Sequence, residues 1–271
     1  MARKRARARR PPPRRPVPRQ GAGRPTSPPR LSKLPPLALG LMGLVLLVLA
    51  NVLVQVVRKP TELLGLVFAP SPLTAEQTWA RYGPIAREKS TDLVRAELLA
   101  ALVQVESSGD PLAHTPWRWR WTLDPLRIYG PASSAVGLLQ ITDGTFEQAR
   151  HYCIHGHRVV SDAGPLWDRC WFNALYFRTI PRHAIEVTSA WLHLGVEEAR
   201  ARRGAGPLSS AQRDALAATV HLCGRARAAA LLSHGFIVRP GERCGGEELR
   251  AYLERVRVEA ALFERMGSGG A

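Results

Sequence analysis

The chain has 271 residues, of which 45% are hydrophobic, and its formal net charge is +16. Residues 1–33 carry twelve Lys or Arg and no Asp or Glu, so most of this charge lies in one tail. The remainder is only mildly basic, which argues against a nucleic-acid-binding protein. A Pro-rich basic tail buries too little apolar surface to offset its ordering entropy, so we expect residues 1–33 to be disordered.

An uncharged apolar segment, residues 34–57, follows the tail. We expect it to form a single transmembrane helix, because about 20 apolar residues suffice to cross the hydrocarbon core. The N-terminal positive cluster predicts a cytoplasmic tail, which would also attract anionic lipid, and an exported chain beyond residue 60. One alternative is a cleaved signal peptide with its cleavage site at residues 48–50. For the tail, the alternative to lipid attraction is that it docks a cytoplasmic partner.

The rest of the chain is predicted to be all-α. Residues 58–73 are expected to be a linker because they contain several prolines, and residues 74–271 should form one helical domain. No run of alternating apolar and polar residues is long enough to predict a sheet. Capping patterns, apolar periodicity and breakers predict helices at about 74–83, 91–106, 142–147, 171–178, 181–203, 209–223, 225–232 and 247–266.

All four cysteines follow the apolar segment. An even number of cysteines in an exported domain indicates two disulfides, for which three pairings are possible. We favour Cys153–Cys170 and Cys223–Cys244, since each closes a short local loop. The alternative is a metal site around Cys153, His155 and His157, but the paired Cys-x-x-Cys spacing of structural zinc is missing. We expect no metal and no cofactor.

Residues 117–121 read Trp-Arg-Trp-Arg-Trp. Aromatic faces stack on sugar rings or bases, and arginine adds charge, so this run is compatible with a carbohydrate or nucleic-acid surface. A loop held to the domain by its tryptophans is an equally good interpretation, and the run is too short to predict nucleic-acid binding.

Glu106 ends an otherwise apolar helical segment, residues 98–105. An acid in this position should lie partly out of water. We therefore expect its pKa to be raised, as the chemistry of a general acid requires.

Two motifs around this acid occur in a fixed order. Residues 98–111 read Leu-Leu-Ala-Ala-Leu-Val-Gln-Val-Glu-Ser-Ser-Gly-Asp-Pro, and residues 135–141 read Ala-Val-Gly-Leu-Leu-Gln-Ile. Together they resemble the soluble lytic murein transglycosylases, whose lysozyme-like helical domain carries a Glu-Ser motif and then a Gly-Leu-Met-Gln motif. Leu139 stands where that family usually has Met. The resemblance covers roughly residues 90–235.

The resemblance implies a single lysozyme-like domain behind the anchor and an activity on peptidoglycan glycan strands. Glu106 would protonate the β-1,4 bond between N-acetylmuramic acid and N-acetylglucosamine. As a carboxylate it would then deprotonate the muramoyl 6-hydroxyl, giving a 1,6-anhydro product. Ser107, Gly137, Leu138 and Gln140 would bind or position the sugar. The implied location is the bacterial inner membrane with the domain in the periplasm, where envelope proteins are further possible partners.

A third family motif resembles Ala-Tyr-Asn-Ala-Gly, and its tyrosine contacts the catalytic acid. Its best match here is residues 217–224, which places His221 at the tyrosine position. A neutral histidine can donate a hydrogen bond to Glu106, whereas a protonated one would lower the pKa of Glu106. His221 could instead be a core histidine.

Two other functions remain open on the sequence alone. A hydrolytic muramidase would need a second acid, and the nearby acids are Asp110, Asp124 and Asp143. A catalytically impaired relative would bind glycan and act as a scaffold for an envelope assembly.

Overall fold

The computed structural model describes residues 35–58, 71–163, 169–204 and 206–269. Helix α1 (Pro36–Arg58) coincides within two residues with the predicted transmembrane segment. Its residues 36–57 are long and apolar enough to cross a membrane, a property that signal sequences share. The tail and most of the predicted linker lie outside the described residues.

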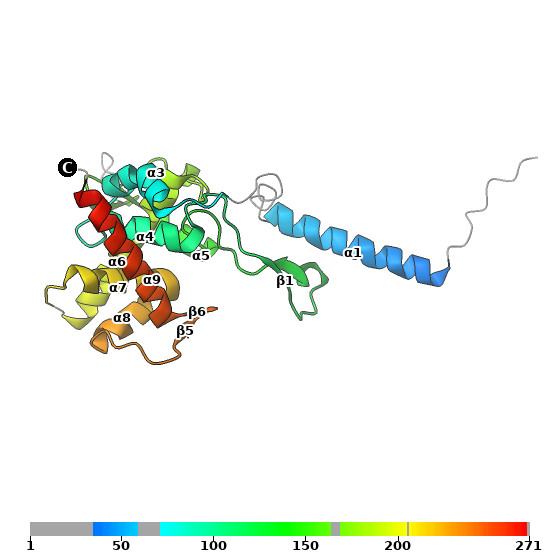
Figure 1. The fold of residues 1–271 in the computed structure, drawn as a ribbon. Coiled ribbons are helices and arrows are strands. Elements are labelled where there is room, and N and C mark those ends of the chain that lie inside the picture. The colour runs from blue at the N-terminus through cyan, green and yellow to red at the C-terminus, as the bar shows by residue number, and fades with distance from the viewer. Residues whose placement is uncertain (1–34, 59–70, 164–168, 205, 270–271) are drawn as a thin grey trace, which may run out of the picture. The chain divides into compact units, whose positions relative to one another are not determined.

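From residue 71 onward the described chain is mostly helical (Figure 1). The helices are α3 (Ala75–Glu88), α4 (Ala96–Ser107), α5 (Asp143–Ala149), α6 (Pro181–Arg203), α7 (Ser210–Cys223), α8 (Arg225–Ser233) and α9 (Leu249–Ser268). Short 3-10 turns occur at Pro125–Arg127 and Asn173–Leu175. The predicted all-α class is thus confirmed as a mostly helical fold.

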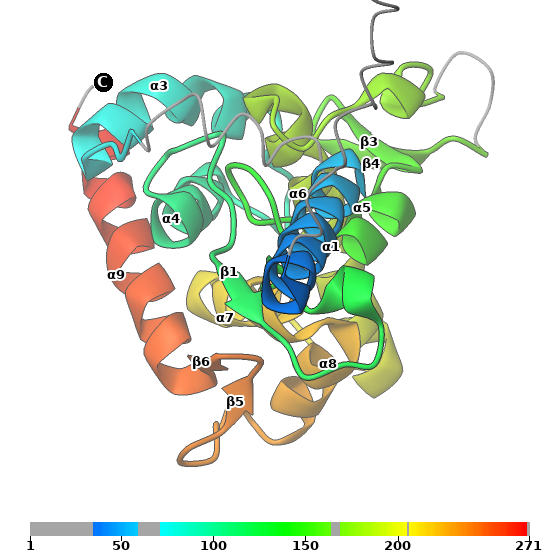
Figure 2. The ribbon, with the colours of Figure 1, turned by 90° about the vertical axis from the view of Figure 1, so that its right-hand side faces the viewer.

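Helix α4 forms the centre of the core. Its side chains from Leu98 to Val103 have no exposed surface. The sequence of α4 favours this position because Ala and Leu combine high helix propensity with apolar burial on every face. Helices α3 and α9 pack against α4, and α6, α7 and α8 form a second group that α7 joins to α9 (Figure 2).

Local sequence signals explain where several helices begin. Capping boxes open α3, at Thr74 and Gln77, and α7, at Ser209 and Gln212, as the sequence predicts. Helix α6 begins with Pro181 in its first turn and ends at Gly204 in the left-handed conformation.

The expectation that the domain lacks strands is wrong, because short strands are present. Three antiparallel pairs are present in the described chain, and their strands are β1 (Trp117–Trp119) with β2 (Tyr129–Pro131), β3 (Tyr152–His155) with β4 (Arg158–Ser161), and β5 (Arg243–Cys244) with β6 (Glu247–Glu248). Strands of two to four residues are too short for alternation to be recognised. The β3–β4 turn does carry a signal in the sequence, the glycine at position 156. Gly156 and His157 both have positive φ, as a two-residue hairpin turn of type I′ requires.

Two helix predictions are also wrong in detail. Helix α3 continues through Pro84 instead of ending before it, since the buried packing of its later residues offsets the lost backbone hydrogen bond. Residues 171–178 contain only the 3-10 turn. There, Asn173 is buried and donates to the carbonyl oxygens of Arg150 and Tyr152, both at 2.7 Å, which holds the backbone against another segment.

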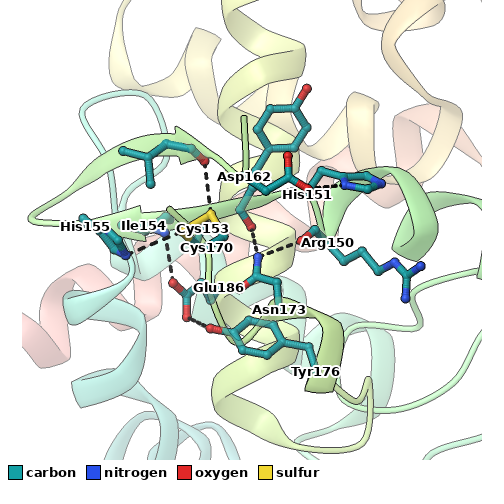
Figure 3. Close-up of a disulfide and its surroundings, with 12 residues drawn as sticks. Arg150, His151, Cys153, Ile154, His155, Asp162, Cys170, Asn173, Tyr176 and Glu186 are labelled. Carbon is teal, nitrogen blue, oxygen red and sulfur yellow. Dashed lines mark hydrogen bonds and ion pairs between the residues drawn. A yellow bond between two sulfur atoms is a disulfide. The ribbon is translucent and has the colours of Figure 1, made fainter. Parts of the chain in front are cut away.

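Both favoured disulfide pairings are present. Cys153–Cys170 fastens β3 to the segment that enters the 3-10 turn at Asn173, and Figure 3 shows its surroundings. Cys223–Cys244 fastens the end of α7 to β5. In the first disulfide Cys153 has no thiolate, so it cannot serve as a ligand of the alternative metal site with His155 and His157.

Candidate active site

Glu106 lies in the last turn of α4, where the core helix reaches the surface. Ser108 adopts the left-handed conformation with φ of 50° and Gly109 follows with φ of 77°, which ends the helix at once. The side chain of Glu106 is 17% exposed. The acid is therefore held by a rigid buried helix but keeps access to solvent.

Two other helices bring polar groups to this carboxylate. The hydroxyl of Tyr252, on α9, donates to Glu106 Oε1 at 2.6 Å. His221 Nε2, near the end of α7, lies 3.4 Å from the same oxygen. Both contacts fall on Oε1, which leaves Oε2 uncommitted within the part of the chain that the structure describes.

These contacts set the ionisation of Glu106. Burial raises its pKa, but hydrogen bonding to His221 and Tyr252, with the positive charges of His221 and Arg255, outweighs burial, so the pKa lies below its usual range. The sequence-based expectation of a raised pKa is therefore wrong for the free protein. Burial and the Glu106 charge raise the pKa of Tyr252, so its hydroxyl stays protonated and able to donate.

Glu106 opens into a groove of about 450 Å³, which we call the Glu106 groove. It runs between the end of α4, the 133–142 segment, the end of α7 and the β6–α9 region. Among its lining residues, those with polar or charged side chains include Glu106, Thr115, Gln140, Thr142, His221, Glu247, Tyr252 and Arg255.

The Gly-Leu-Leu-Gln motif contributes Gln140 to the wall of this groove. Gly137 has φ of +79°, and a Cβ there would lie 2.4 Å from the carbonyl oxygen of Arg178, so only glycine fits. Gln140 lines the groove, and its Nε2 donates to the carbonyl oxygens of Ala113 and Gly137, both at 3.0 Å. The motif thus fixes a tight loop that places Gln140 in the groove with Glu106.

Two predicted sugar contacts have another role. The Ser107 hydroxyl donates to the Leu138 carbonyl oxygen at 2.7 Å, which ties the end of α4 to the motif loop. The Leu138 side chain has no exposed surface and belongs to the core. A direct sugar contact by the Leu138 side chain is therefore excluded, because an apolar residue in that position packs inward beside Leu139.

The three acids considered for a hydrolytic mechanism are structural. Asp110 accepts from the Leu112 backbone in a turn, Asp124 accepts from Leu126 at the start of a 3-10 turn, and Asp143 pairs with Arg178. None of these three acids lines the Glu106 groove.

The second carboxylate of the groove is instead Glu247, at β6. Its Oε2 accepts from Arg255 at 2.8 Å, and both side chains are half exposed.

A comparison with protein-family models finds no match for this chain, and neither does a comparison with curated protein sequences.

Sequence reasoning missed Tyr252, Arg255 and Glu247, which all lie beyond the region of resemblance. The tyrosine that contacts Glu106 comes from the last helix, as Tyr252, while His221 contacts the same oxygen from α7. The only signal was indirect: Tyr252 and Arg255 are three residues apart, so a helix places them on one face.

Proposed function

We propose that the protein is a membrane-anchored peptidoglycan lytic transglycosylase with Glu106 as its catalytic acid and base. The observation that carries the proposal is the Glu106 carboxylate, which lies at the end of a helix whose residues 98–103 are buried, accepts a hydrogen bond from Tyr252 and lines an open groove. The resemblance of the Glu-Ser and Gly-Leu-Leu-Gln motifs to the lytic transglycosylases supports the substrate class.

The geometry supports a two-step use of one carboxylate. In its protonated form, Glu106 gives its proton to the glycosidic oxygen while the C1–O bond to the leaving N-acetylglucosamine breaks. The resulting carboxylate then removes the proton of the muramoyl 6-hydroxyl as its oxygen bonds to C1. The hydrogen bond from Tyr252 stabilises the carboxylate that the first step produces, and the second step restores the acid.

The position of Glu247 favours a second candidate, a hydrolytic muramidase. Glycosidases that hydrolyse their substrate use two carboxylates on opposite sides of the scissile bond. Glu247 lines the same groove as Glu106, so it could activate a water molecule. Its ion pair with Arg255 argues for a structural role, because the pair occupies one of its oxygens.

Product analysis distinguishes the two enzymes. Purified sacculi are digested with the wild-type protein and with Glu247→Gln, and the released fragments are weighed by mass spectrometry. We expect anhydro-muropeptides from both proteins. Fragments heavier by about 18 Da, whose release stops in Glu247→Gln, would instead establish hydrolysis with Glu247 as the second carboxylate.

The lowered pKa of Glu106 favours a third candidate, a glycan-binding scaffold with impaired catalysis, because an ionised acid cannot protonate a leaving group. The same digestion tests it. Sacculi that retain the wild-type protein on sedimentation but release no fragment of either mass would support the scaffold and contradict both enzymes.

The proposed setting is the bacterial inner membrane, with α1 as an uncleaved anchor and the helical domain in the periplasm. The two disulfides support export, because such bonds persist in oxidising compartments. The intact mass of the protein recovered from membranes tests the anchor. Loss of the first 50 residues would show that α1 is a cleaved signal sequence.

A further inference from the structure

The β1–β2 hairpin, residues 117–131, presents an aromatic surface that the Glu106 groove does not use. We call this segment the Trp-Arg hairpin. Trp117 and Trp119 both lie against Tyr129, with ring centroids 5.3 and 4.7 Å apart. Trp119 is nevertheless 66% exposed, and Trp121 and Leu123, in the connecting segment, are fully exposed.

Arginine occupies the other face of this hairpin. Side chains alternate along a strand, which places Arg118 and Arg120 on the face opposite Trp119, and the Arg120 guanidinium group also donates to the Pro131 carbonyl oxygen. The pairing extends past β1, because the Arg120 backbone donates to the Ile128 carbonyl oxygen at 2.7 Å. Asp124 is the only acidic residue of the hairpin, and it pairs with Arg127. The hairpin therefore combines an exposed apolar surface with a net positive charge.

The apolar surface and the charge together fit one occupant. Tryptophan rings concentrate at the headgroup level of bilayers, where one end of the ring is apolar and the other is wet, and arginine attracts lipid phosphates. A fully exposed aliphatic side chain such as Leu123 gains from acyl chains but has little to gain from a sugar ring. We propose that the Trp-Arg hairpin inserts its exposed side chains into the interfacial layer of an anionic lipid bilayer.

The anchor of the proposed function supplies this bilayer. Only residues 59–70 separate α1 from the first described residue of the folded part. Whatever its conformation, a chain of this length reaches at most about 45 Å. When α1 spans a membrane, the domain stays close to the lipid surface, so a weak interfacial contact is sufficient to orient it.

Quenching by brominated lipids tests the insertion with the full chain. The protein is reconstituted into phosphatidylglycerol–phosphatidylcholine vesicles with or without 6,7-dibromo acyl chains, and tryptophan emission is compared. We expect part of the wild-type emission to be quenched and this part to be lost in Trp119→Phe/Trp121→Phe. The matched control is Trp171→Phe, which removes another exposed tryptophan outside the hairpin and should keep the quenched part.

The charge contribution has its own variant. Quenching of the wild type should be stronger in phosphatidylglycerol than in pure phosphatidylcholine, and Arg118→Gln/Arg120→Gln should remove this difference. Glu106→Gln should be quenched like the wild type, so the result does not depend on catalysis.

Three outcomes would overturn the proposal. The first is equal wild-type emission in brominated and plain vesicles. The second is quenching that survives in the double tryptophan variant or is lost equally in Trp171→Phe. The third is emission that responds to added chito-oligosaccharides, through Trp119 and Trp121, but not to bromine, which would make the hairpin a glycan-binding surface.

Discussion

Within the described residues, two glutamates each accept a hydrogen bond from a tyrosine hydroxyl, but their surroundings differ. Glu106 is bonded by Tyr252 at 2.6 Å and lies at the Glu106 groove. Glu186, on α6, is bonded by Tyr176 at 2.9 Å beside the Cys153–Cys170 disulfide (Figure 3). The side chain of Glu106 is 17% exposed, whereas that of Glu186 is 4% exposed.

Glu186 uses both of its oxygens. Oε1 accepts from the Ile154 backbone at 2.9 Å, and Oε2 lies 3.0 Å from the ammonium group of Lys89 in addition to its bond from Tyr176. Its partners come from the residue that caps α3, from β3 and from the segment before α6, so the carboxylate joins three parts of the fold. A buried acid with a permanent cation and no uncommitted oxygen is a structural group.

Glu106 has the opposite arrangement. Tyr252 donates to one of its oxygens only, His221 lies near that same oxygen, and the carboxylate faces a groove. The comparison indicates that a tyrosine partner alone does not identify a catalytic acid. The decisive differences are an uncommitted oxygen and access to a ligand.

The largest effect is expected when the Glu186 carboxylate is removed. Glu186→Ala leaves the buried Lys89 ammonium with only Glu88, 3.6 Å away, and removes the acceptor of the Tyr176 hydroxyl and the Ile154 backbone. The free energy of unfolding should therefore fall by about 3–5 kcal/mol. Urea unfolding of the purified chain in detergent micelles, followed by tryptophan fluorescence, measures it.

The matched control for this change is Glu254→Ala on α9, which removes an exposed ion pair with Arg257. Because solvent screens this pair, its loss should leave the urea midpoint close to that of the wild type. Equal losses for the two variants would show that Glu186 does not hold the fold as described.

The next prediction separates the two tyrosines. Tyr252→Phe removes a hydrogen bond to the Glu106 carboxylate, worth about 1.5–3 kcal/mol, so the rate of fragment release from sacculi should fall by roughly 10- to 100-fold. Tyr176→Phe makes the same deletion at Glu186. It should lower the urea midpoint while the release rate per folded molecule stays near that of the wild type. An unchanged rate in Tyr252→Phe would remove Tyr252 from the site.

The smallest expected effect concerns pH. The partners of Glu106 hold its pKa below the usual range, so the protonated acid becomes scarcer as pH rises through that pKa. His221→Gln removes a positive charge beside the carboxylate, which raises the pKa of Glu106. The descending limb of kcat/KM against pH should therefore move to higher pH.

The control for the pH shift is His193→Gln. His193 contacts Thr91 and does not line the Glu106 groove. The descending limb of kcat/KM against pH for His193→Gln should coincide with that of the wild type. A limb that stays in place in His221→Gln, or moves to lower pH, would contradict the assigned influence of His221.

Local signals in the sequence predicted much of the fold. The capping boxes at Thr74 and Ser209 and the apolar run of α4 depend on neighbouring residues, so helix positions and the acid at Glu106 followed from the sequence. Both disulfides followed from loop length. The strands pair within local hairpins, but at two to four residues each they are too short to be recognised from alternation. The turn at Asn173 depends on contacts with Arg150 and Tyr152, more than 20 residues away, which no local pattern encodes.

The residues of the candidate site also divide into those that local motifs predict and those that depend on distant contacts. Glu106, Gly137 and Gln140 lie in motifs whose order could be recognised, and His221 was found by its position in a third motif. Tyr252 and Glu247 reach the groove only because α9 packs along α4, more than 140 residues away in sequence. The lowered pKa of Glu106 was missed for the same reason, since part of the charge and hydrogen bonding that lowers it comes from α9.

The central claim is that Glu106 performs the chemistry while Glu186 holds the fold. The most direct measurement is the rate at which Glu106→Gln releases anhydro-muropeptides from purified sacculi, taken with its free energy of unfolding. We predict a loss of about 10²- to 10⁴-fold in rate, the usual contribution of a general acid, with the unfolding free energy within about 1 kcal/mol of the wild type. A folded Glu106→Gln protein that releases these fragments at the wild-type rate would contradict the account.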